Sequence, residues 1–276
     1  MTYPVANNLT EILGKLNVSI TGNKADLITK TGFEGLDRNY FGIAPRELWI
    51  VGGYTSAGKS FFLSQLLLNI TKQNKKVLLF SLEMSTESIA ARLWGNYSGL
   101  SPAKIEWGNL NLEESTLKNS SLEELKQDGE NIYIVDDIYS IKGMIPIIES
   151  IKPDFVFIDY LQNLQANTDE YQKLTSASAQ LQLLAKKYDC AFVCASQVSN
   201  EEQKIGVNNT SIIGLKGSGA IAASADFVVW LEKKIDYTVE THQYIDVFVR
   251  KSRRGPVRKF DFELQLPSGK FVERKI

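Results

Sequence analysis

The chain has 276 residues, of which 43% are hydrophobic and 23% charged, and this composition indicates a globular protein with a sizeable core. The 10% of aromatic residues, with only 7 Pro, exclude low-complexity disorder, and a formal net charge of -1 excludes a generally basic nucleic-acid coat, although a local basic groove is compatible with it. A lone histidine, His242, argues against a zinc site built on histidines and against a Ser-His-Asp triad, while Cys190 and Cys194 share one apolar run and are expected to be buried.

Short apolar runs alternate with helical patterns along most of the chain. Strands are predicted over Leu48–Gly52, Val77–Leu82, Ile132–Val135, Phe155–Asp159, Ala191–Ser196 and Phe227–Leu231. Helices are predicted over Lys59–Lys72, Thr86–Tyr97, Ser121–Lys126, Ile141–Ile151 and Ser176–Tyr188. The alternation predicts an α/β fold whose mostly parallel, twisted sheet is flanked by helices.

The two ends of the chain have a different character. Residues 1–30 are expected to form a short amphipathic helix, Asn7–Leu16, and a polar linker, so that residues 31–276 are the folded domain. Three alternating runs are predicted to form an antiparallel β-ribbon at the sheet edge: Tyr244–Lys251, Val257–Leu266 and Lys270–Lys275. The start lacks a signal peptide, and the most apolar stretch is too short to span a bilayer, so we expect a soluble, cytoplasmic protein with no membrane partner.

A phosphate-binding loop is the strongest motif in the sequence. Residues 53–60 match G-x-x-x-x-G-K-[ST] and lie between a predicted strand and a predicted helix, which is the context that this motif requires. Backbone amides of such a loop wrap phosphates, Lys59 reaches the β- and γ-phosphates, and Ser60 binds Mg²⁺. We therefore predict ATP and Mg²⁺ as cofactors, with the nucleotide bound by Gly53, Tyr54, Thr55, Ser56, Ala57, Gly58, Lys59, Ser60 and Phe61.

Three more polar residues follow predicted strands at what must be the same sheet edge. Asp159 ends the strand FVFID in the Walker B pattern and is predicted to hold the metal together with Ser60. Glu83 follows VLLFSL and is a candidate general base for the attacking water, although a solvent-facing helix-start carboxylate fits its spacing equally well. Gln197 follows AFVCAS and is a candidate sensor of the γ-phosphate.

Together these stretches resemble the C-terminal motor domain of the DnaB-type replicative hexameric helicases, a branch of the RecA-like ATPases. The matching stretches are TGFEGLD (31–37), GGYTSAGKS (52–60), LLFSLEMS (78–85), FVFIDYLQ (155–162), ASQVS (195–199), GSGAIAASAD (217–226) and RKSRRGP (250–256). The resemblance implies a homo-oligomeric ring, usually a hexamer, which encircles single-stranded DNA and moves along it while ATP is hydrolysed between subunits.

The resemblance also implies roles for single residues. Glu83 resembles the catalytic glutamate, Asp159 the Walker B aspartate, and Gln197 the glutamine that couples nucleotide state to DNA. Lys251 and Arg253 resemble paired cationic fingers that enter the neighbouring subunit's site; strand alternation is expected to put Lys251 on the same face as Ile245, Val247 and Val249. Lys216 and Gly219 match DNA-backbone contacts, Arg92 matches an arginine that often follows SLEMS, and the helix near Asn7–Leu16 resembles a linker helix that docks on the adjacent subunit.

Two departures from the family keep other hypotheses open. The collar or primase domain that usually precedes the linker is not in this sequence, so a separate primase or loader is an expected partner and a compact phage- or plasmid-type helicase fits. The expected DNA-facing loops are also only weakly basic. The alternative is a non-unwinding RecA/RadA/KaiC-like ATPase, acting as a recombination mediator or an ATP-gated replication assembly factor.

Overall fold

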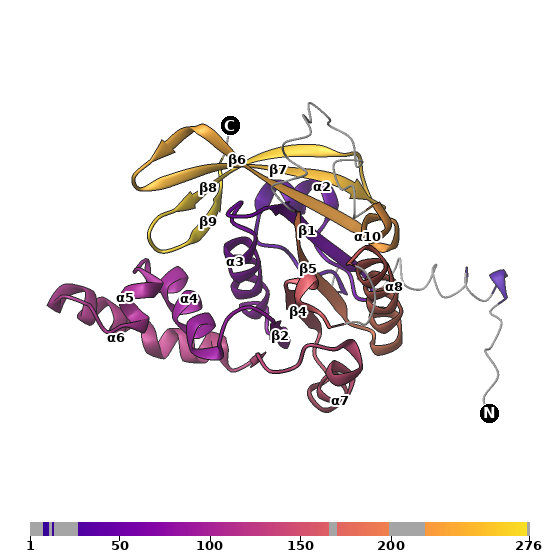
Figure 1. Cartoon of the computed structure of the whole chain (residues 1–276), viewed down its shortest axis with the longest axis horizontal. Coiled ribbons are helices and arrows are strands. Elements are labelled where there is room, and N and C mark those ends of the chain that lie inside the picture. The colour runs from indigo at the N-terminus through magenta and orange to yellow at the C-terminus, as the bar shows by residue number, and fades with distance from the viewer. Residues whose placement is uncertain (1–7, 11–12, 14–26, 166–169, 199–218, 275–276) are drawn as a thin grey trace.

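The computed structural model describes residues 8–10, 13, 27–165, 170–198 and 219–274. Its centre is a nine-stranded sheet in the order β3-β2-β4-β5-β1-β6-β7-β8-β9 (Figure 1). The strands are β1 (Leu48–Tyr54), β2 (Val77–Ser81), β3 (Ile132–Val135), β4 (Phe155–Asp159), β5 (Ala191–Val198), β6 (Phe227–Val239), β7 (His242–Ser252), β8 (Arg258–Gln265) and β9 (Lys270–Glu273). In this order, the first six strands, from β3 across to β6, pair in parallel, and the strands from β6 to β9 pair antiparallel. This confirms the predicted α/β sheet with its C-terminal ribbon.

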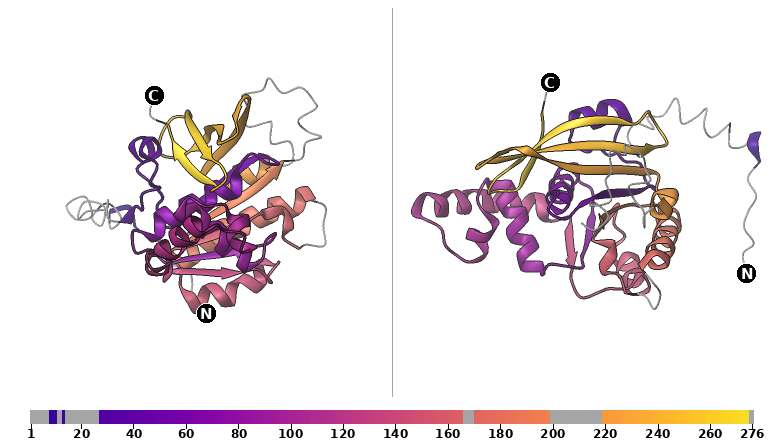
Figure 2. Two further views of the ribbon diagram at one scale, coloured as in Figure 1. Left: turned by 90° about the vertical axis from the view of Figure 1, so that its left-hand side faces the viewer. Right: turned by 45° about the horizontal axis from the view of Figure 1, so that its top comes forward.

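Helices cover both faces of the parallel part of the sheet (Figures 1 and 2). The helices are α2 (Glu34–Tyr40), α3 (Lys59–Thr71), α4 (Thr86–Ser98), α5 (Pro102–Glu106), α6 (Leu112–Gly129), α7 (Ile141–Ile151), the 3-10 turn η2 (Leu161–Asn163), α8 (Glu170–Tyr188) and α10 (Gly219–Ser224). Alternate strand residues point to opposite faces, so Leu79 belongs to the apolar layer that includes residues of α2, α3 and α4, whereas Leu78 belongs to the layer that includes residues of α7, α8 and α10. Two apolar layers therefore hold the sheet, and both cysteines are free and buried as expected.

The C-terminal ribbon folds over α3, the helix that follows the phosphate-binding loop. Phe62 of α3 lies 5.3 Å from Phe271 of β9 and 6.3 Å from Phe262 of β8, measured between ring centroids. Phe33, just before α2, stacks on Phe62 at 5.2 Å. Burying these rings stabilises the fold by roughly 25 cal/mol for each Å² of apolar surface removed from water. This packing fixes α3, and with it the first residues after the loop.

The carboxylate of Asp37 binds the segment that precedes α2. Asp37 of α2 accepts hydrogen bonds from the backbone amides of Thr31 (2.8 Å) and Gly32 (3.0 Å) and from the Thr31 hydroxyl (2.9 Å). Asn69 of α3 then donates to the Thr31 carbonyl at 2.9 Å. These hydrogen bonds connect the start of the TGFEGLD stretch to both α2 and α3.

Several elements differ from the prediction. Helices α2, α5 and α10 were not predicted. Helix α6 is longer than the predicted Ser121–Lys126; its first half was missed because α6 buries only Ser121 and so has a weak amphipathic pattern. A capping box between Asn111 and Glu114 starts α6 in place of an apolar stripe. Most of the predicted N-terminal helix Asn7–Leu16 lies outside the described residues.

Candidate nucleotide-binding site

The loop from Tyr54 to Gly58 joins the carboxyl end of β1 to the amino end of α3. Gly58 is the residue before α3 and has a left-handed φ of 89°, a backbone conformation that favours glycine. A Cβ on Gly53 would lie 2.9 Å from the carbonyl oxygen of Leu231 in β6, so only glycine fits there. Because no side chain caps the start of α3, its first amides can bind an anion. The strand, loop and helix are arranged as the motif requires.

Lys59 folds back over this loop. Its side chain is buried, and Nζ donates to the carbonyl oxygens of Gly53 at 3.0 Å and Tyr54 at 2.8 Å. Burial lowers the pKa of Lys59 from 10.5 to about 8, while the negative charges of Asp159 and Glu83 oppose this shift. A phosphate group would supply the compensating negative charge at close range.

Asp159 ends β4 beside Ser60 and is one of the few buried carboxylates, with 6% of its surface exposed. Burial raises its pKa, whereas its hydrogen bond with the Ser60 side chain and the charges of Arg92 and Lys59 lower it. Within the part of the chain that the structure describes, Oδ1 has no hydrogen-bond partner. A buried carboxylate oxygen without a partner, next to a hydroxyl, is suited to Mg²⁺, which binds one or two protein oxygens together with phosphate and water. In the described ranges, no group of three or more His, Cys, Asp or Glu residues is placed to hold a metal ion.

Glu83 follows β2 at the same edge of the sheet. Ser81, the last residue of β2, pairs with Asp159, and its hydroxyl donates to the carbonyl oxygen of Met84 at 2.6 Å. This turn presents the Glu83 side chain at the surface. Burial lowers the pKa values of Lys59 and Arg92 and raises that of Tyr160, and the charge of Glu83 opposes the first two shifts and adds to the third. The structure thus brings Glu83, Asp159 and Lys59 together.

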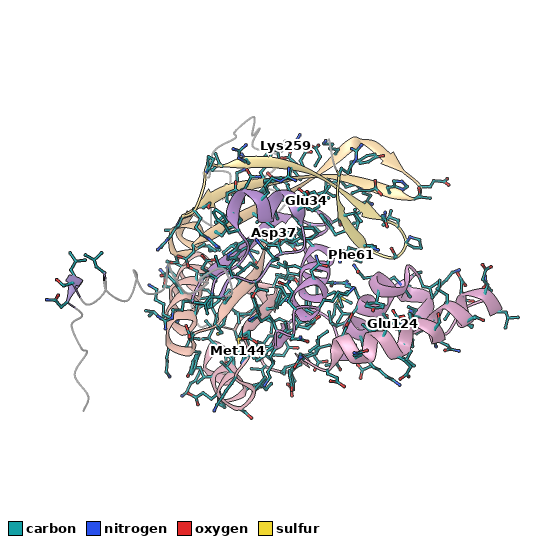
Figure 3. All side chains as sticks on the ribbon, turned by 180° about the vertical axis from the view of Figure 1, so that it is seen from behind. Glu34, Asp37, Phe61, Glu124, Met144 and Lys259 are labelled. Carbon is teal, nitrogen blue, oxygen red and sulfur yellow. The ribbon has the colours of Figure 1, made fainter. Side chains whose placement is uncertain are left out.

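Arg92 of α4, to which the sequence alone assigns no role, is a further member of this site. Its guanidinium lies over the ring of Phe61, 4.9 Å from the centroid, on the side of the molecule where Figure 3 labels Phe61. Burial lowers the pKa of Arg92, and the charges of Asp159 and Glu83 oppose that shift. Its Nη1 is buried without a hydrogen-bond partner among the described residues. The sequence places Arg92 three residues after Ile89, which is buried in the structure, but this spacing alone does not reveal the contact with Phe61.

Gln197 reaches the loop from β5. It pairs with Gly53 in the parallel ladder between β1 and β5, and its Nε2 donates to Thr55 Oγ1 at 3.0 Å. Polar residues at the carboxyl ends of β1, β2, β4 and β5 therefore meet at one edge of the sheet, as expected for parallel strands.

Lys251 and Arg253 lie elsewhere in the fold. Lys251 pairs with Val228, which in turn pairs with Ile50 of β1, three residues before Gly53. At about 3.3 Å per residue, this puts Lys251 about 10 Å from the level of Gly53 along the strand direction, toward the amino end of β1. The Lys251 Nζ donates to the carbonyl oxygen of Ala223 at 2.9 Å, and the Arg253 Nε lies 3.0 Å from Asp226 Oδ1. Neither joins the phosphate-binding loop of its own chain.

The predicted face of Lys251 is wrong. Val229 pairs with Val249, but Val228 pairs with Lys251, so a β-bulge at Arg250 inserts one extra residue into β7. The bulge reverses the alternation, and Lys251 lies on the α10 side of the sheet, opposite to Val249. Of the predicted DNA-contacting residues, Gly219 begins α10 and Lys216 lies outside the described residues.

In the described part of the chain, no helix is both long enough and apolar enough to cross a bilayer.

Comparisons with known proteins agree with this geometry. The replicative DNA helicase DnaB of Geobacillus stearothermophilus is 28% identical over 290 residues, covering 96% of this chain and 62% of that protein. A solved ATPase domain superposes with a TM-score of 0.87 at 23% identity, covering 98% of this chain and 100% of that one. A solved DnaB-like replicative helicase, described together with its interactions with primase, superposes with a TM-score of 0.83 at 24% identity, covering 98% and 68%. The chain thus spans only about three-fifths of the length of such a full relative.

A family model described as the DnaB-like helicase C-terminal domain matches residues 29–273, which include the loop, both strand-end carboxylates and the ribbon. The chain therefore belongs to the DnaB-like helicase C-terminal domain family.

Proposed function

We propose that this chain is the ATP-hydrolysing motor of a replicative DNA helicase that works as a ring on single-stranded DNA. The observation that carries the proposal is the convergence of Lys59, Asp159, Glu83 and Arg92 around the phosphate-binding loop. Two carboxylates and two cations at the end of a parallel sheet match the needs of phosphoryl transfer, in which catalysis is mostly positioning and charge stabilisation.

Each residue has a defined task in this proposal. The loop amides and Lys59 bind the phosphates of ATP, and Ser60 and Asp159 hold Mg²⁺. The metal, when bound, neutralises charge that develops on the phosphate oxygens. Glu83, exposed beside the loop, accepts a proton from the attacking water, and Arg92 stabilises negative charge on the transferred group. Gln197 reports the phosphate state through its hydrogen bond to Thr55.

The positions of Lys251 and Arg253, the two predicted cationic fingers, support a ring. Lys251 and Arg253 lie away from the phosphate-binding loop of their own chain, with Lys251 at the level of Ile50 near the amino end of β1. A phosphate that they contact therefore belongs to another subunit. A head-to-tail contact of this kind repeats around a closed ring, and we propose a hexamer. We also propose that Lys216 and Gly219 contact the DNA backbone, that the N-terminal helix docks on the adjacent subunit, and that a separate primase or loader binds the ring; the last proposal is supported by the solved relative described with primase.

The test combines ATP hydrolysis, with and without single-stranded DNA, and unwinding of a forked duplex. We expect DNA to stimulate hydrolysis and the fork to be unwound, both lost in Lys59→Ala. The matched control is Lys72→Ala, which removes the lysine that follows the other end of the same helix, where it lies 3.9 Å from Asp128. Stimulated hydrolysis without unwinding would favour the non-unwinding RecA-like alternative. Hydrolysis retained in Lys59→Ala above about a tenth of the original rate would refute the nucleotide site.

A further inference from the structure

Strand β5 extends beyond its neighbour β4. The two strands pair up to Ile158 and Cys194, β4 ends at Asp159, and β5 continues to Val198. On its other side β5 stays paired with β1 through Gln197 and beyond. The backbone amide and carbonyl groups of Gln197 thus lie beyond the point where β4 supplies hydrogen-bond partners. Without another partner on this side, the end of β5 would be bound to the sheet less firmly.

The side chain of Gln162 occupies this position. Its Oε1 accepts a hydrogen bond from the Gln197 backbone amide at 3.0 Å, and its Nε2 donates to the Gln197 carbonyl oxygen at 2.6 Å. The same Nε2 also lies 3.1 Å from the hydroxyl oxygen of Ser196. A carboxamide carries the same donor and acceptor as a peptide group, so Gln162 replaces one residue of the missing strand.

Gln162 is itself held in place by its neighbours. It lies in η2, between the buried Leu161 and Asn163, whose side chain donates to the carbonyl oxygen of Leu82 at 3.0 Å. Lys173 of α8 donates to the Gln162 carbonyl oxygen at 2.7 Å. The carboxamide is therefore presented to β5 by a fixed turn, and its contacts are with the backbone of Gln197 and with Ser196.

We infer that Gln162 is a positioning residue that holds the end of β5 so that the Gln197 side chain meets the phosphate-binding loop. Gln197 has a neighbour on each side: it pairs with Gly53 of β1 in the parallel ladder, and its backbone forms two hydrogen bonds with the Gln162 side chain of η2. Its side chain is then aimed at Thr55 Oγ1, 3.0 Å away. The inference rests on the proposed role of Gln197 in ATP hydrolysis, and it assigns to the final residue of DYLQ a task distinct from metal binding.

The test is a double-mutant cycle on ATP hydrolysis by the full chain. Gln162→Met keeps the side-chain length and removes the carboxamide, and Gln197→Ala removes the group that it positions. Because two hydrogen bonds to Gln197 are lost, we expect kcat to fall about tenfold, with the KM for ATP changed less than about twofold. In the Gln197→Ala background, Gln162→Met should have no further effect, since residues that act through one another are not additive.

A matched control is Gln65→Met in α3. Gln65 is also half-buried, and its carboxamide accepts from the Phe271 backbone amide at 3.3 Å and donates to Asn69 at 3.0 Å, away from the nucleotide. It should leave kcat unchanged. A direct readout is backbone hydrogen exchange, in which the amide of Gln197 should exchange faster in Gln162→Met while that of Gly53 does not.

The possible outcomes separate the two hypotheses. If Gln197→Ala lowers kcat but Gln162→Met does not, or if the two losses multiply, Gln162 does not act through Gln197 and the inference is overturned. If Gln197→Ala itself leaves kcat unchanged, the proposed role of Gln197 fails and the inference fails with it. A fall in kcat for Gln162→Met that is absent in the Gln197→Ala background, with faster exchange at Gln197, supports both.

Discussion

Arg253 and Arg254 are adjacent in the turn after β7, yet their replacement should have opposite consequences. Arg253 has 60% of its side chain exposed and forms one ion pair, with Asp226. Arg253 is the exposed end of this pair, whereas Asp226 is buried and keeps a hydrogen bond from the Leu48 amide, so Arg253→Ala should lower the free energy of unfolding by no more than about 1 kcal/mol. The contact with Asp226 is made through Nε, so the two terminal nitrogens are the atoms that would bind a second anion. If they bind the neighbour's γ-phosphate, the rate of ATP hydrolysis should fall about a thousandfold.

Arg254 is half-buried in its own subunit. Its Nη2 donates to the carbonyl oxygen of Gly42 at 2.7 Å and lies 2.6 Å from Glu47 Oε2. Glu47, which also accepts from the Trp49 indole at 2.9 Å, already has a pKa raised by burial. Arg254→Ala leaves this carboxylate without its cation, so we expect a loss of about 2 kcal/mol of stability and a smaller loss of activity than in Arg253→Ala.

The assays are urea unfolding for stability and steady-state ATP hydrolysis for activity, followed by mixing. Arg253→Ala subunits keep their loop and Lys59→Ala subunits keep their fingers. Mixed rings then contain some intact interfaces, and their activity should exceed that of either variant alone. Absence of rescue, with mixed assembly verified by pull-down of differently tagged subunits, would refute action in trans. Retained hydrolysis in Arg253→Ala would refute the finger role altogether.

Three further predictions concern other parts of the chain. Glu83→Gln should keep ATP affinity while stopping turnover, since it removes the base and keeps the shape; loss of affinity in a nucleotide titration would mark Glu83 as structural. Deleting residues 1–20 should disrupt ring assembly and leave the thermal unfolding of the core unchanged; an unaltered mass by light scattering in ATP would contradict linker-helix docking. Because burial lowers the pKa of Lys59 to about 8, the ammonium loses its proton as pH rises through this value, so ATP affinity should fall between about pH 7 and pH 9. Lys59→Arg, which stays charged, should show a flatter profile, and equal pH dependence in both would count against the shifted lysine.

Local sequence patterns predicted the elements that position the site. The phosphate-binding loop needs only its glycines, Lys59 and a flanking strand and helix, all of which are consecutive in the chain. Asp159 and Gln197 end strands buried on both faces, and such strands appear as continuous apolar runs. Parallel pairing then puts their carboxyl ends at one edge, so the convergence of distant residues followed from the predicted topology.

Tertiary structure decided what depends on pairing between distant segments. The bulge at Arg250 depends on how β7 pairs with β6, and it moved Lys251 to the other face of the sheet. Arg92 joined the site because α4 packs its inner side toward Phe61, and a lone arginine in a helix carries no signal of that contact. The Gln162 side chain bonds the backbone of β5 because β4 ends before β5 does. Sequence periodicity records which side of an element is buried. The contacts of Lys251 and Gln162 depend on the registers and lengths of neighbouring strands, and the contact of Arg92 depends on how two helices pack, and these arise only when distant segments come together.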